Sequence, residues 1–112
     1  MRPDDRIRVL HMIEAIESAV AFVSGREAED LQTDRMLLFA LVRAIEVTGE
    51  AASKVSEELR LNSPDIPWSL IVSMRNRLIH AYFDIDRDIL WKTATVDLHV
   101  LLPKLQALID KE

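Results

Sequence analysis

A basic stretch in the second half of the chain holds the residues best suited to chemistry. Between Trp68 and Phe83 there is no acidic residue, yet Arg75, Arg77 and His80 lie within six positions. The chain as a whole is acidic, with 19 Asp and Glu against 14 Lys and Arg and a formal net charge of -5. The stretch is therefore the one concentrated basic patch of the sequence, and an anionic ligand suits it.

Several side chains of this stretch would share one face if it is helical. At about 100° per residue, Asn76 and His80 are about 40° apart and Arg77 and His80 about 60° apart. Arg75 is about 140° from His80, so their partnership requires the long arginine to swing or the helix to change its winding. We expect an amide, a guanidinium and an imidazole together on this face.

Such a set of side chains could cleave a phosphodiester without a metal. An imidazole can take a proton from a ribose 2′-hydroxyl or give one to the leaving oxygen. Arginine binds phosphate through paired donors and stabilises charge on its oxygens, and asparagine adds an uncharged donor. By spacing alone, arginine and histidine on one helix are more often a solvated face.

Two glutamates and a run of aspartates keep simpler explanations beside the chemical ones. Glu46 and Glu50 could orient Arg75 or His80, or they could lie on a solvated face with Glu50 paired to Lys54.

Asp84, Asp86 and Asp88 alternate as at the start of a calcium loop. The sixth and twelfth positions hold Ile89 and Thr95 instead of glycine and glutamate, which excludes an EF-hand. Helix capping is the better account of these aspartates.

The composition predicts an all-α fold that positions these residues. The 112 residues, 49% of them hydrophobic, suffice for a single domain spanning 1–112. Helix formers dominate, and only 2 Gly and 4 Pro occur. We expect an up-and-down bundle of about four to five helices.

Caps and breakers divide the first half into two long helices. The first should run from Pro3 to Gly25, with one apolar stripe formed by Ile7, Leu10, Ile13, Ile16, Val20 and Val23. The second, roughly 40 Å long, should start at a Thr33 cap and bury the heptad-like series Leu38, Leu41, Ile45, Thr48, Ala52, Val55 and Leu59. Gly49 inside it costs about 1 kcal/mol relative to alanine, so either another helix approaches closely there or the weak spot is tolerated.

The second half should hold two more helices after a loop from Arg60 to Pro67. The third helix should start at Pro67 and fray near Tyr82 or Phe83. The fourth should be capped by one of the aspartates at 84 and 86, and Pro103 should kink it.

The absence of cysteine and of long apolar runs excludes other classes. With 0 Cys there is no disulfide framework, thiolate metal site or cysteine nucleophile. His11 and His99 lack ligand-spaced partners, so we expect them to be structural or solvent-facing. No apolar run approaches the roughly 20 residues that span a bilayer, and no signal peptide is recognisable, so we expect a cytoplasmic protein that does not bind membranes.

Longer strings in the chain resemble a known family. MRNRLIHAYFDID (74–86) resembles the signature of HEPN-domain proteins, an arginine, a polar residue, three further residues and a histidine. The continuation through Tyr82 is similar to the histidine–any–tyrosine extension of HepT, the toxin of type VII toxin–antitoxin pairs. RAIEVTGEAASKV (43–55), IPWSLIVSMRNRLIHAYFDID (66–86) and LLPKL (101–105) resemble the second, third and last helices of that family.

This resemblance implies an all-α HEPN bundle that forms a homodimer, with two arginine–histidine motifs in a shared cleft. Arg75 and His80 would be the catalytic residues of a metal-independent ribonuclease without cofactors, supported by Asn76 and Arg77. The partners would be RNA and a minimal, MntA-like nucleotidyltransferase antitoxin that adenylylates Tyr82. A dimer would also concentrate positive charge that one acidic monomer lacks.

Two classes of function remain open at this stage. The first is a ribonuclease toxin with Arg75 and His80 catalytic. The second is a non-catalytic HEPN module in which the same residues hold a nucleotide or nucleic acid, or dock the nucleotidyltransferase. Without the family match, Tyr82 would simply anchor the end of the third helix.

Overall fold

The computed structural model describes residues 1–81 and 84–111, which form an elongated helical bundle of 42 × 28 × 20 Å. Its elements in chain order are α1 (Pro3–Val23), α2 (Asp30–Thr33), α3 (Arg35–Ser53), α4 (Glu57–Asn62), α5 (Trp68–Val72), α6 (Met74–Leu78), β1 (Ile79–Ala81), β2 (Asp84–Ile85), α7 (Arg87–Lys92), the π-helix η1 (Thr93–Asp97) and α8 (Leu98–Asp110).

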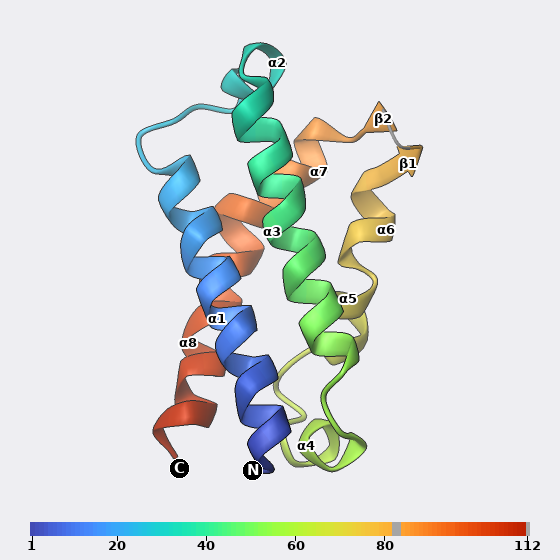
Figure 1. Cartoon of the computed structure of the whole chain (residues 1–112). Helices are drawn as coiled ribbons and strands as arrows, with labels where there is room; N and C mark the ends of the chain where they lie inside the picture. Colours follow the sequence, from blue (N-terminus) through green and yellow to red (C-terminus); the bar gives the residue numbers. More distant parts are fainter. Residues whose placement is uncertain (82–83, 112) are drawn as a thin grey trace.

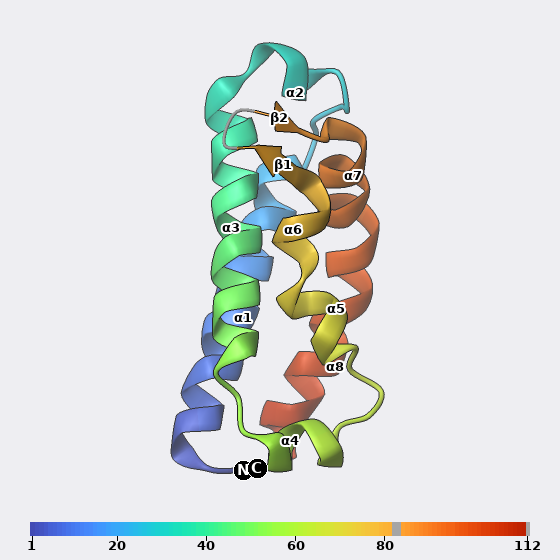
Figure 2. The same cartoon turned by 90° about the vertical axis from the view of Figure 1, so that its right-hand side faces the viewer.

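The long elements run alternately up and down the bundle axis (Figures 1 and 2). α1 rises from the end where both termini lie, and α3 descends beside it. α5 and α6 then rise next to α3, and α7, η1 and α8 return as one irregular arm. α1 packs against α3 and α8, while α3 also packs against α5 and α6. The predicted all-α, up-and-down bundle is confirmed.

α1 lies where the sequence predicts, but its buried face is rotated. Pro3 opens the helix, and Gly25, just past its end, has a φ of 72°, the left-handed conformation that closes many helices. Ile7 and Leu10, predicted in the apolar stripe, are exposed. The buried positions are Asp5, Val9, Met12, Ile13, Ala15, Ile16, Ala19 and Val23. Asp5, a charged residue, thus occupies a core position that apolar periodicity does not predict.

Asp5 is buried because α4 satisfies its carboxylate. The two carboxylate oxygens accept hydrogen bonds from the backbone N–H of Ser56, at 2.8 Å, and from its hydroxyl, at 2.5 Å. The Ser56 hydroxyl oxygen also accepts from the N–H of Leu59 and so caps α4. A buried carboxylate without such partners would be strongly unfavourable. This contact ties the start of α1 to the start of α4.

The predicted bounds of the second long helix are wrong at both ends. Asp34, not Thr33, is the N-cap of α3, because its carboxylate accepts from the N–H of Leu37 while Thr33 still belongs to α2. The helix stops at Ser53, and the guanidinium of Arg60 donates to carbonyls at its end. α4 therefore covers part of the predicted loop from Arg60. The predicted burial is nevertheless confirmed for the whole series Leu38, Leu41, Ile45, Thr48, Ala52, Val55 and Leu59.

An ion cluster closes the turn between α1 and α3. Arg26 donates to Asp30 at 3.2 Å and to Asp34 at 2.7 Å. The hydrogen bond from Arg26 holds the pKa of the Asp34 carboxyl below its ordinary value, and the N–H of Leu37 acts in the same direction. For Asp30 the larger cause of a lowered pKa is the backbone N–H of Glu27, followed by Arg26. The turn is thus held by charge-assisted bonds in addition to the buried side chain of Leu31.

The third arm ends earlier than predicted, in a short hairpin. α6 stops at Leu78, and Ile79 adopts extended angles of φ -113° and ψ 107°. Ile79 then pairs with Ile85 across the antiparallel ladder, and the N–H of Asp86 donates to the carbonyl of Leu78 at 2.8 Å. These partners take the backbone groups that a longer helix would use. The predicted fraying point at 82–83 lies outside the described residues.

The fourth arm contains an irregularity that the sequence does not announce. Asp86 is the N-cap of α7, as predicted, and accepts from the N–H of Ile89. Between α7 and α8 the chain widens into η1, a π-helix of 5 residues. α8 continues through Pro103 without ending, so the kink expected there stays a prediction.

α5 approaches α3 most closely at Gly49. A Cβ atom placed on Gly49 would lie 3.2 Å from the carbonyl oxygen of Ile71 and 3.5 Å from that of Val72. Both neighbours are backbone atoms, which move less easily than the end of a side chain. Of the two readings of this glycine, close approach of another helix is therefore confirmed.

This packing predicts the effect of enlarging Gly49. We expect Gly49→Val to lower the free energy of unfolding by about 1–3 kcal/mol, because overpacking forces α5 away from α3. Urea denaturation followed by circular dichroism measures the change. Glu50→Val, at the exposed neighbouring position, is the control and should change stability by less than about 0.5 kcal/mol. Equal effects of the two substitutions would contradict the packing argument.

Candidate functional site

The basic stretch is divided between α6 and the hairpin instead of lying on one helix. Arg75, Asn76 and Arg77 belong to α6, but His80 lies in β1. The helical angles expected between His80 and the other residues are therefore wrong, because the chain is extended from Ile79 onward. All four of these side chains are exposed at or near the hairpin end of the third arm.

Arg75 faces α3 and is held by a carboxylate there. Its Nε donates to Oε2 of Glu46 at 2.9 Å, with the two side chains 48% and 31% exposed. The geometry leaves the remaining N–H groups of the guanidinium available for an anion. Of the two interpretations of Glu46, contact with Arg75 is thus observed. Glu50, one turn along α3, pairs with Lys54 at 3.5 Å, as its simpler interpretation predicts.

Arg77 lies on a different side of α6 from Arg75. Its Nη2 donates to the carbonyl of Leu70 at 3.1 Å. It lines a cavity of about 320 Å³ between α5–α6 and the last arm, together with Lys92 and Lys104. Arg75 and Arg77 are two positions apart, which corresponds to about 200° of rotation around a helix and accounts for their separation. The structure thus does not bring Arg75 and Arg77 into one site within a single chain.

The buried side chains of α6 fix these orientations. Met74 and Leu78 are 5% and 0% exposed and anchor α6 against α3 and α7. With the apolar side of α6 turned inward, Arg75 and Asn76 stay exposed, Arg75 at the edge of α6 next to α3. Tyr82, the predicted modification site, lies outside the described residues.

The remaining candidates from the sequence stand apart from this region. His11 and His99 are exposed, as expected for isolated histidines. Among the described residues, no three His, Asp or Glu side chains gather where they could hold a metal ion. Over the same residues, none of the helices has the length and apolar character that a bilayer span requires.

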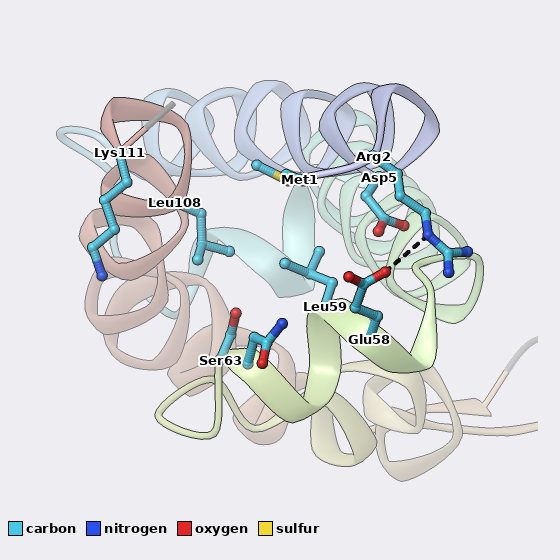
Figure 3. Close-up of a pocket in the computed structure, with 9 residues that line it drawn as sticks. Met1, Arg2, Asp5, Glu58, Leu59, Ser63, Leu108 and Lys111 are labelled. Atoms are coloured by element: carbon cyan, nitrogen blue, oxygen red, sulfur yellow. Dashed lines mark hydrogen bonds and ion pairs between the residues drawn. The ribbon is translucent and has the colours of Figure 1, made fainter.

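A cavity at the opposite end of the bundle contains no part of the basic stretch. Figure 3 shows this cavity of about 480 Å³, lined from α1, α4 and α8. Arg2 and Glu58 pair across its mouth at 3.0 Å. Asp5, at its edge, already uses both carboxylate oxygens on Ser56. Three charged side chains of this cavity, Arg2, Asp5 and Glu58, thus already have partners within the chain.

Comparison with known proteins assigns the chain to a family. Residues 12–109 match the family described as "Ribonuclease HepT-like". The chain belongs to this family. The match covers all four helical arms, so the HepT-like assignment applies to the whole bundle and not only to the basic stretch.

Relatives of this HepT-like chain carry ribonuclease names. It is 39% identical over 95 residues to "Probable ribonuclease HepT" of Thermococcus cleftensis, covering 85% of this chain and 86% of the relative. It is 32% identical over 102 residues to "Putative RNase TTE0752" of Caldanaerobacter subterraneus, covering 91% of each. No solved structure matches the chain significantly. At the level of the HepT-like family, the comparisons support ribonuclease activity.

Proposed function

We propose that the chain is a metal-independent RNA endonuclease and the toxin of a toxin–antitoxin pair. The observation that carries the proposal is the exposed pair of Arg75 and His80 on an acidic chain of the HepT-like family, with Arg75 positioned by Glu46. A guanidinium held by Glu46 and an exposed imidazole five residues further along the same arm offer phosphate binding and proton transfer.

The proposed reaction needs only these groups. His80 takes the proton of a ribose 2′-hydroxyl, and the 2′-oxygen forms a bond to phosphorus. The bond from phosphorus to the 5′-oxygen breaks, and a protonated imidazole gives that oxygen its proton. Arg75 stabilises the charge on the phosphoryl oxygens throughout. The products are a cyclic phosphate and a free 5′-hydroxyl, and no metal or cofactor enters.

A homodimer would supply the second imidazole. If the two-fold axis passes near His80, one imidazole acts as base and its symmetry mate as acid. Two copies would also bring their basic residues together along the cleft. One chain alone, with a net charge of -5, has less positive charge at this place.

The dimer is tested by sedimentation at micromolar concentration. We expect a dimer for the parent chain and a mixture of monomer and dimer for a charge-reversed Arg75→Glu variant, because two new carboxylates would face each other across the axis. A monomeric parent, or a dimer unaffected by Arg75→Glu, would remove the shared cleft from the proposal.

Catalysis is tested by three alanine variants compared on one RNA substrate. We expect His80→Ala and Arg75→Ala to lower cleavage by at least about 100-fold, the usual contribution of acid–base and charge-stabilising groups. Arg77→Ala should lower it far less, because Arg77 lines a separate cavity. Cleavage should persist in the presence of a chelator. RNA binding without cleavage by the parent chain would instead favour the non-catalytic module.

Regulation is proposed to act at Tyr82, two residues beyond His80. A cognate nucleotidyltransferase antitoxin would transfer an adenylyl group to its hydroxyl, placing a phosphate where it competes with RNA for arginine donors.

Tyr82→Phe keeps the ring and removes only the acceptor oxygen. We expect this variant to fold, to remain toxic, and to escape modification when the nucleotidyltransferase and ATP are supplied. Mass spectrometry reports the added mass and its position. Adenylylation on another residue, or full neutralisation of Tyr82→Phe, would defeat this regulation.

A further inference from the structure

An exposed aromatic side chain stands on α3 with a cation over its ring. Phe39 is 54% exposed, and the guanidinium carbon of Arg35 lies 5.4 Å from the centre of its ring. Among the described residues, no carboxylate pairs with Arg35. The neighbouring Met36 is 84% exposed and extends the apolar surface. Large apolar groups left in water in this way commonly mark a contact site.

Phe39 belongs to the same stripe of α3 as Glu46, the residue that holds Arg75. The two positions are seven residues apart, which returns the helix to nearly the same face two turns away. Along α3 this separation amounts to about 10.5 Å. Phe39 lies on the side of Glu46 toward the start of α3, the end at which the hairpin stands (Figures 1 and 2).

The third arm continues past Arg75 toward the same end of the bundle. Three helical steps and two extended steps separate His80 from Arg75, at most about 11 Å along the chain. α3 and the third arm run in opposite directions (Figures 1 and 2) and meet at the ion pair of Arg75 with Glu46, so Phe39 and the hairpin lie on the same side of that ion pair along the bundle. A single strand that leaves Arg75 along α3 toward this end would therefore pass the aromatic ring.

The chemistry of this pair fits a nucleobase with its phosphate. Exposed aromatic rings bind the bases of single strands by stacking, and arginine adds both a stacking plane and a positive charge. A second copy of the chain could also cover apolar surface, but the unpaired charge of Arg35 on the ring favours an anionic ligand with a π-face.

We propose that Phe39 and Arg35 form a base-stacking subsite for single-stranded RNA next to Arg75 and His80. The proposal rests on the proposed function, and it assigns Phe39 to binding and not to the chemical step. A base stacked on Phe39 sets the register of the bound strand, so that a phosphate of the same strand reaches Arg75. Double-stranded RNA, whose bases stack on each other, is excluded from such a subsite.

The test measures RNA binding apart from cleavage. The full chain carries His80→Ala, and the probe is a short single-stranded RNA with one 2-aminopurine, whose fluorescence falls on stacking. We expect Phe39→Leu to weaken binding by at least about fivefold and to abolish the fluorescence change, since stacking contributes at least about this factor per base. Phe39→Trp should restore both. Phe22→Leu, the same change at a 41% exposed phenylalanine on α1, should alter neither.

A salt titration separates stacking from charge. The slope of binding against salt should be the same for Phe39→Leu as for its parent, whereas Arg75→Ala should reduce it by about 0.7, the value for one phosphate contact on a single strand. In chains with His80 intact, Phe39→Leu should raise KM and leave kcat nearly unchanged.

Either of two binding results would contradict the proposed subsite: equal binding by Phe39→Leu and Phe39→Trp, or unchanged fluorescence quenching in Phe39→Leu. A shift of Phe39→Leu to monomer in sedimentation would also contradict it, because this surface would then belong to the contact with a second copy. The proposed nuclease fails separately, if the parent chain leaves RNA uncut while quenching by Phe39 persists.

Discussion

The position of the candidate site depends on how closely the backbones of α3 and α5 approach each other. At Gly49 the carbonyl oxygen of Ile71 would lie only 3.2 Å from an added Cβ atom, closer than an ordinary contact. The contact lies one turn from Glu46 on α3 and one turn from Arg75 on the third arm. Because the backbones are in contact, the distance between those two side chains is set by main-chain packing, which is far stiffer than two long flexible side chains.

The ion pair between Arg75 and Glu46 has a positional rather than an energetic role. Half-exposed pairs of this kind contribute roughly 0–1 kcal/mol to stability. The stability of the bundle comes from elsewhere, from a continuous apolar core and from the buried contact of Asp5 with Ser56. The Arg75 side chain can therefore stay in water, where an anion can reach it, without weakening the fold.

The sequence predicts the fold class and most of the core. It does not predict where α6 ends or that His80 lies in a strand. The heptad-like series on α3 and α4, the Asp86 cap and the glycine closing α1 are local signals and are confirmed. The end of α6 is decided by pairing of Ile79 with Ile85, which no local propensity reveals. That pairing moves His80 off the helix.

Closeness in the sequence groups Arg75 and Arg77 in one basic patch, but a spacing of two residues puts them about 200° apart on a helix. Which of them faces α3 depends on the buried side of α6, and Met74 and Leu78 decide that. A phenylalanine at helical spacing normally indicates core, so the sequence does not mark Phe39 as a surface residue. Its 54% exposure in the folded chain distinguishes it.

The π-helix between α7 and α8 has a consequence for how chains of this fold can vary in length. Leu90, Ala94 and Leu98 follow one another at intervals of four, and all three are 0% exposed. In an ordinary helix such a series drifts by about 40° at each step, whereas the wider turn of η1 absorbs one additional residue and keeps the series better aligned. Loss of a single residue between Thr93 and Asp97 would convert the segment to a regular helix while α8 keeps its orientation. This arm can therefore accept a one-residue deletion at a point inside a helix, where most helices cannot.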